Sequence, residues 1–138
     1  MPKPYLTKIR WAEPGEGQQI KGLCLAGGMW NIADLDWTQV YRGWLLGEDK
    51  EGVVACVQIR MGWPLAGLEM LFVHPAVTPR QRALIVRDMS EIACSVVHDM
   101  GGQVVHFTVP DHFPQWKKIV ERRRCMPYYP AMSYLRKV

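Results

Sequence analysis

The residues that could bind an anion lie at the start of a long predicted helix. Thr78 is a good N-cap and Pro79 a good first helical residue, and arginines follow at Arg80 and Arg82. A helix N-terminus carries unpaired backbone N–H groups and about half a positive charge. We expect the N–H groups of Arg80, Gln81 and Arg82, with two guanidinium groups, to hold a phosphate. The alternative is a capped helix start that only faces solvent.

A second candidate for chemistry is Glu69, a carboxylate in the apolar strand before this helix. Such a group could remove a proton from an attacking amine, directly or through water. Strict alternation along the strand instead places Glu69 toward solvent, opposite Leu68, Met70 and Phe72. The sequence supports both readings equally.

Other common site signatures are absent from the sequence. There is no GxxxxGK[ST] phosphate loop, no GxSxG nucleophile turn and no glycine-rich dinucleotide motif. The cysteines form no Cys-x-x-Cys or Cys/His cluster, so we expect free, buried thiols and no metal site. They are Cys24, Cys56, Cys94 and Cys125.

Length and composition indicate one domain over residues 1–138, with 49% hydrophobic residues for its core. The net charge of +4 is too small and too dispersed to indicate nucleic acid as a partner. The densest basic stretch, residues 117–124, reads as a solvated helix face. The sequence shows neither an apolar run that could cross a membrane nor an apolar signal core. We therefore expect a cytoplasmic protein without a membrane partner.

Hydrophobic periodicity predicts alternating strands and helices. The strand–helix–strand stretch over residues 65–109 implies a parallel pair with a right-handed crossover, whereas the hairpins before it are antiparallel. Strands are expected at residues 5–11, 43–47, 53–61, 65–74, 103–109 and 132–136, and helices at residues 18–26, 34–42, 78–100 and 113–123.

This order resembles the GCN5-related N-acetyltransferase (GNAT) superfamily. The strand end Val73, His74, Pro75 matches the family's Val-x-Pro, and Arg80 stands at its Arg/Gln position. Ala83 and Ile85 stand where the family has small residues, usually glycine. The resemblance implies an α/β fold with a mixed, mostly antiparallel central sheet flanked by helices on both faces.

The resemblance also implies an acyl-CoA cofactor, acetyl-CoA or another. It implies that Phe72 and Val73 bind the pantetheine arm, chiefly through the backbone. The pyrophosphate would be bound by Arg80, Gln81, Arg82 and Ala83.

For catalysis, the resemblance makes Glu69 the candidate base. The family's general-acid tyrosine is missing from the expected helix. Tyr128 could replace it, although packing beside its neighbouring prolines is the favoured reading. Three tryptophans fall where such folds line the acceptor side, and a core role is favoured for them too. They are Trp30, Trp37 and Trp44.

The leading hypothesis is an acyl-CoA-dependent N-acyltransferase that acts on a small-molecule or protein amine. The rival is a non-catalytic GNAT-like binding or assembly protein, such as a phage virion or accessory component, with a homodimer or assembly partner. Arg80 and Glu69 favour the enzyme, whereas the missing glycines and tyrosine favour the rival.

Overall fold

The computed structural model describes residues 3–29, 33–108, 118, 120–123 and 125. The chain divides into two units, Met1–Phe107 and Thr108–Val138. In the second unit, Lys118 and residues 120–122 are helical, within the helix predicted over residues 113–123. The predicted strand at 132–136 lies outside the described residues.

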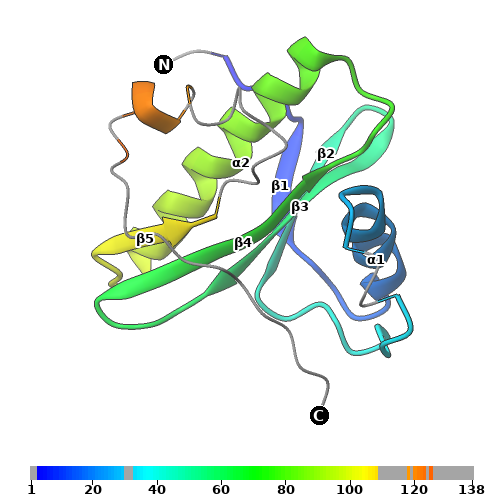
Figure 1. Cartoon of the computed structure of the whole chain (residues 1–138), viewed down its shortest axis with the longest axis horizontal. Helices are drawn as coiled ribbons and strands as arrows, with labels where there is room; N and C mark the ends of the chain where they lie inside the picture. The colour runs from blue at the N-terminus through cyan, green and yellow to red at the C-terminus, as the bar shows by residue number, and fades with distance from the viewer. Residues whose placement is uncertain (1–2, 30–32, 109–117, 119, 124, 126–138) are drawn as a thin grey trace. The chain divides into compact units, whose positions relative to one another are not determined.

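The first unit is a sheet with a helix on each face, α1 on one side and α2 on the other (Figure 1). The strands follow the chain in the order β1-β2-β3-β4-β5; β4 and β5 are parallel and the other neighbours antiparallel. This confirms the predicted mixed, mostly antiparallel sheet. The elements are β1 (Lys8–Trp11), α1 (Gly17–Ala26), β2 (Trp44–Asp49), β3 (Gly52–Arg60), β4 (Leu65–Val73), α2 (Pro79–Asp99) and β5 (Val104–Phe107).

The expected helix over residues 34–42 is wrong. Asp36 accepts hydrogen bonds from the backbone N–H and the hydroxyl of Thr38, at 2.9 and 2.7 Å. The Val40 N–H then bonds to the carbonyl of Trp37 at 3.1 Å, over three residues instead of four. The Asp36 side chain thus closes a local turn that competes with a helix.

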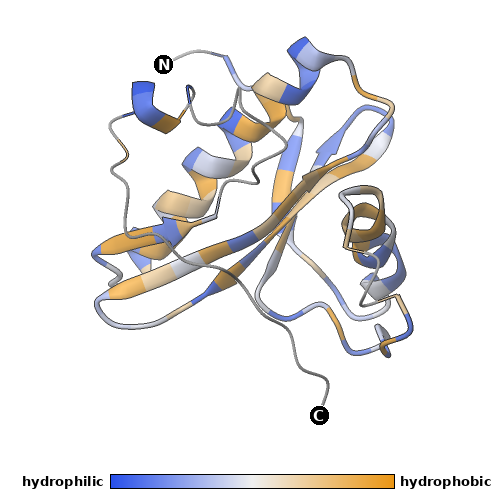
Figure 2. Cartoon of the chain, in the orientation of Figure 1, coloured by the Kyte–Doolittle hydropathy of each residue, from blue (hydrophilic) through white to orange (hydrophobic). Residues whose placement is uncertain are grey.

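Each helix buries apolar residues. Along α2, hydrophobic and hydrophilic bands alternate (Figure 2). On the α2 face the sheet comes close to the helix at Gly47. A Cβ there would lie 2.7 Å from Met89 Sδ and 2.8 Å from Leu6 Cδ1. The fully or almost fully buried apolar residues of α2 are Ile85, Met89, Ala93 and Val97.

The α1 face contains Trp37 and Trp44, both in the core as the favoured reading expected. Cys24 and Cys56 are buried there. Cys94 is exposed on α2, so the expectation of a buried thiol is wrong at that position. None of the helices among the described residues is long and apolar enough to span a membrane.

A buried carboxylate ties the start of the chain to α2. Asp88 Oδ2 accepts the backbone N–H groups of Tyr5 and Leu6, at 2.7 and 2.9 Å. Arg87 donates to Asp88 Oδ1 at 2.8 Å and to the carbonyl of Lys3 at 3.0 Å. Asp88 is 7% exposed, so these bonds are shielded from water.

We expect Asp88→Ala to destabilise the protein by about 2–4 kcal/mol, because two backbone N–H groups would lose a charged acceptor. Urea unfolding measures this. Asp99→Ala, at the exposed end of α2, is the matched control and should change stability by less than about 0.5 kcal/mol. Equal effects of the two variants would contradict a structural role of the Asp88 bonds.

A second network joins β1, β2 and the start of α1. Arg10 forms a bidentate ion pair with Glu16, in which both hydrogen bonds measure 2.7 Å. Its Nε also donates a hydrogen bond to Glu48 at 2.9 Å. Hydrogen bonding to Arg10 lowers the pKa of Glu16 below its ordinary value.

Because the Glu16 pKa is lowered on folding, its stabilising contribution is present above the unfolded-state pKa and is lost as pH falls through the folded pKa. We expect the stability difference between wild type and Glu16→Gln to be about 1–3 kcal/mol at neutral pH and to shrink in acid. Urea unfolding across pH measures it. A difference that does not vary with pH would refute this.

Candidate functional site

Strand β4 contains a bulge at its centre. Phe72 pairs with Cys56 and Glu69 with Gln58, so Met70 and Leu71 together oppose the single residue between those partners. Met70 has φ +54°, a backbone torsion that residues other than glycine seldom adopt. Such a conformation costs a non-glycine residue about 1–3 kcal/mol. Bulges of this kind are frequent next to active sites.

The bulge decides where Glu69 lies. Regular alternation would place Glu69 and Phe72 on opposite faces of the sheet, since they are three positions apart. With the extra residue between them, both pair with β3 residues of the α1 face: Phe72 with Cys56, and Glu69 with Gln58. Gln58 in turn pairs with Trp44, a member of the α1-side core. The alternation reading is therefore wrong in placing Glu69 opposite Phe72, whereas Glu69 does lie opposite Leu68 and its side chain is 37% exposed.

Beyond the bulge, β4 has a strand neighbour on one side only. Its pairing with β5 covers residues 65–68. Among the described residues, the rest of β4 pairs with β3 alone, and β4 runs on past the end of β5 (Figure 1). Backbone groups of β4 that point away from β3 therefore form an open edge, which can hydrogen-bond an extended ligand.

Charged side chains gather on the α1 face below the bulge. Arg60 Nε lies 3.5 Å from Glu69 Oε2, and their side chains are 63% and 37% exposed. A Cβ on Gly67 would lie 3.3 Å from His106 Nε2 and 3.7 Å from Glu69 Oε1. The Glu69 carboxylate and the His106 imidazole therefore flank Gly67, within reach of solvent.

Gln58 adds an unusual acceptor to this group. Its Oε1 atom is buried and has no hydrogen-bond partner within the part of the chain that the structure describes. An unsatisfied buried acceptor costs about 1–3 kcal/mol, and native proteins contain few of them. Gln58, Arg60 and Gly67 could not be identified from the sequence, because their proximity depends on the register of three strands.

The start of α2 is closed by its own residues. Thr78 Oγ1 accepts the N–H of Gln81 at 3.2 Å, and Gln81 Oε1 accepts the N–H of Thr78 at 2.9 Å, which is a capping box. The Arg82 N–H bonds to the carbonyl of Thr78 at 2.9 Å. Two of the three N–H groups that we expected to be free, those of Gln81 and Arg82, are thus occupied.

The side chains of this turn still fit an anion. Arg80 is exposed and Arg82 half-buried, so both guanidinium groups can face a ligand. Ala83 is exposed, whereas Ile85 is completely buried in the core. Ile85 therefore does not obstruct the helix start, although it replaces a small residue of the family pattern.

Phe72 and Val73 can contact a ligand chiefly through their backbone. The Phe72 ring packs against the α1-side core near Gly27, and the Val73 side chain is 7% exposed. The backbone role expected for Val73 stays a prediction. Tyr128 lies outside the described residues, as does Trp30.

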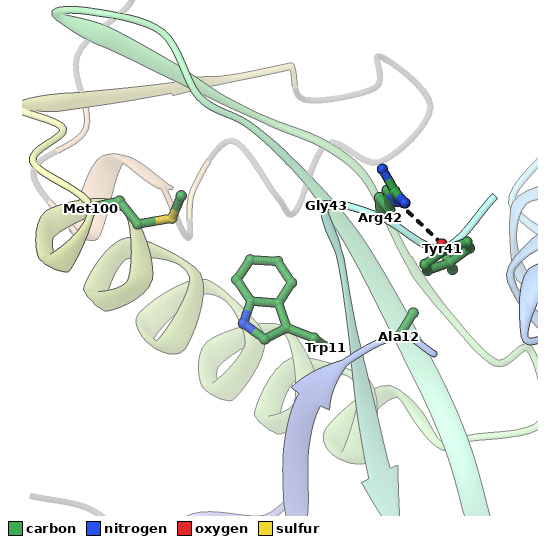
Figure 3. A pocket seen from close by; sticks show the side chains of 6 residues that line it. All are labelled: Trp11, Ala12, Tyr41, Arg42, Gly43 and Met100. Carbon is green, nitrogen blue, oxygen red and sulfur yellow. Dashed lines mark hydrogen bonds between the residues drawn. The ribbon is translucent and has the colours of Figure 1, made fainter. Parts of the chain in front are cut away.

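Two shallow cavities adjoin the sheet. One of about 330 Å³ is lined by α1, by Val53 and by His74 and Pro75 of the loop that leads from β4 to α2. The other, about 340 Å³, contains none of the predicted site residues (Figure 3). Its lining residues are Trp11, Ala12, Tyr41, Arg42, Gly43 and Met100.

Comparison with known proteins gives a fold but no close relative. No protein-family model matches the sequence, and no curated protein matches it significantly. Aminoglycoside N-acetyltransferase AAC(6')-Iy in complex with CoA is similar in structure with a TM-score of 0.69 and 14% identity, covering 100% of this chain and 99% of that one.

Two further solved structures are as similar. Ribosomal-protein-alanine N-acetyltransferase from Brucella melitensis biovar Abortus 2308 has a TM-score of 0.70 at 10% identity, over 95% of this chain and 98% of the other. A transcriptional regulator from Bacillus halodurans C-125 has a TM-score of 0.70 at 12% identity, over 93% and 98%.

These similarities confirm the resemblance inferred from the strand end and the following helix. The neighbours include several acetyltransferases, some of them with CoA bound. With its bulged β4 next to a parallel β5 and its α2 helix, this chain has the fold of the GCN5-related N-acetyltransferases.

Proposed function

We propose that the protein is an acyl-CoA-dependent N-acyltransferase that transfers an acetyl group to a primary amine. The observation that carries this proposal is the bulged β4, open along its second half, leading into a helix start with two accessible arginines. Acetyl-CoA would supply the acetyl group as an activated thioester.

Each part of the site then has a chemical task. Arg80 and Arg82 bind the pyrophosphate as charged donors. The open edge of β4 hydrogen-bonds the pantetheine arm, and the bulge presents backbone groups to the thioester carbonyl, where negative charge develops during attack. Holding the two reactants together supplies much of the rate.

Glu69 is proposed as the base that takes the proton from the attacking amine. Its ion pair with Arg60 is exposed and therefore worth only about 0–1 kcal/mol, so a substrate ammonium group can compete for the carboxylate. Among the similar proteins, the names of two specify an aminoglycoside and a ribosomal-protein alanine as acceptors. The acceptor proposed here is accordingly a small-molecule or protein amine.

Acetyl-CoA at about ten times its Kd should stabilise the wild-type protein by roughly 1.4 kcal/mol, which raises Tm by several degrees. We expect Arg80→Glu to abolish this rise, since it places a negative charge beside the pyrophosphate. Lys50→Glu, the same charge change in the exposed β2–β3 turn, is the control and should keep it. Thermal unfolding with and without the ligand measures both.

No shift of the wild-type protein at millimolar acetyl-CoA would contradict the proposed function. The buried Ile85 is unsuitable for such a test, because replacing it would open a cavity in the core.

We expect Glu69→Gln to lower acetyl transfer to amines about 100-fold or more, the usual contribution of a general base, without weakening acetyl-CoA binding. Release of the CoA thiol with a panel of primary amines measures the rate. Glu51→Gln, in the exposed turn before β3, is the control. Unchanged transfer by Glu69→Gln would eliminate Glu69 as the base.

A further inference from the structure

The Cys56 thiol of β3 hydrogen-bonds to the strained bulge of β4. Cys56 Sγ donates to the carbonyl of Met70 at 3.7 Å, and Met70 is the residue with φ +54°. Cys56 is also the cross-strand partner of Phe72. Cys56 therefore contacts the backbone on both sides of Leu71, the other residue of the bulge.

The surroundings keep this thiol protonated. Cys56 is fully buried, and the neighbouring Cys24 thiol of α1, together with burial, raises the Cys56 pKa. A protonated thiol retains the hydrogen that the Met70 carbonyl needs. An S–H group is a weak donor, but no water competes with it in a buried site.

Other side chains at this position would change the bulge. Alanine or valine would leave the Met70 carbonyl without its side-chain donor, and a carbonyl that loses its donor favours a different backbone conformation. Unusual torsions persist only where the surrounding structure fixes them. The contacts of Cys56 meet this requirement at the bulge.

We propose that Cys56 is a positioning residue for acyl transfer: its thiol holds the β4 bulge so that the backbone on the open edge meets the acyl carbonyl of the bound thioester. This inference rests on the proposed function, because it assumes that acyl-CoA lies along β4. It makes acyl transfer depend on a side chain beneath β4, the Cys56 thiol, that does not itself contact the ligand.

The proposal predicts different changes in affinity for two ligands that differ only in the acyl group. Acetyl-CoA has the carbonyl that the bulge would bind, and CoA lacks it. We expect Cys56→Ala to weaken acetyl-CoA binding by about three- to tenfold, the effect of one hydrogen bond, and to leave CoA binding unchanged. Titration calorimetry with both ligands, below the unfolding temperature of each variant, measures the ratio.

Two variants make the test specific. Cys24→Ala removes the neighbouring buried thiol, which has no bond to Met70, and should lower stability without changing the ratio of the two affinities. Cys56→Ser retains a donor at the same position and should retain most of the preference for acetyl-CoA.

The outcomes are distinguishable. Equal weakening of both ligands by Cys56→Ala, no change at all, or the same ratio change in Cys24→Ala would overturn the role of Cys56 while leaving the proposed function intact. Failure of the wild-type protein to bind either ligand would overturn the proposed function and this inference with it.

Discussion

Within the described residues, strand β4 pairs with β3 on one side between Gly67 and Val73, and with β5 on the other side only from Leu65 to Leu68. A strand inside a sheet normally has hydrogen-bonding partners on both edges. The backbone N–H and C=O groups of an unpaired stretch therefore need other partners, such as water or a ligand. The remaining features of the site follow from this constraint. The bulge begins where the β5 pairing ends, the carboxylate of Glu69 stands at that junction, and the loop after β4 leads into α2.

Much of this architecture could be predicted because it depends on periodicity. The period-two pattern of β3 and the apolar stripe of α2 reflect burial on one face, which a sequence records directly. The capped start at Thr78 is equally local, since it needs only residues within one turn. The turn at Asp36 could not be separated from a helix start, because the same side chain favours both structures.

The site was less accessible to sequence reasoning. Met70 carries no compositional sign of a positive φ, since glycine or asparagine is the usual residue there. Missing that one inserted residue reverses the face assigned to every residue on one side of it. This is why Glu69 could be named as a candidate from the sequence. Its orientation and its neighbours Gln58 and Arg60 could not be predicted. Motif residues such as Arg80 were found because they follow one another along the chain.

The capping box at the start of α2 has a consequence for selectivity. Backbone amides of a loop hold an anion at one fixed position, whereas guanidinium groups match any phosphate by charge and by a planar pair of donors. With Gln81 and Thr78 satisfying each other, anion recognition at this helix in the proposed function would depend mainly on the side chains of Arg80 and Arg82. Such a contact weakens as ionic strength rises and discriminates poorly between one phosphorylated compound and another. The ability to tell an acyl-CoA from other nucleotides would then reside in β4, at the far end of the ligand from its charge.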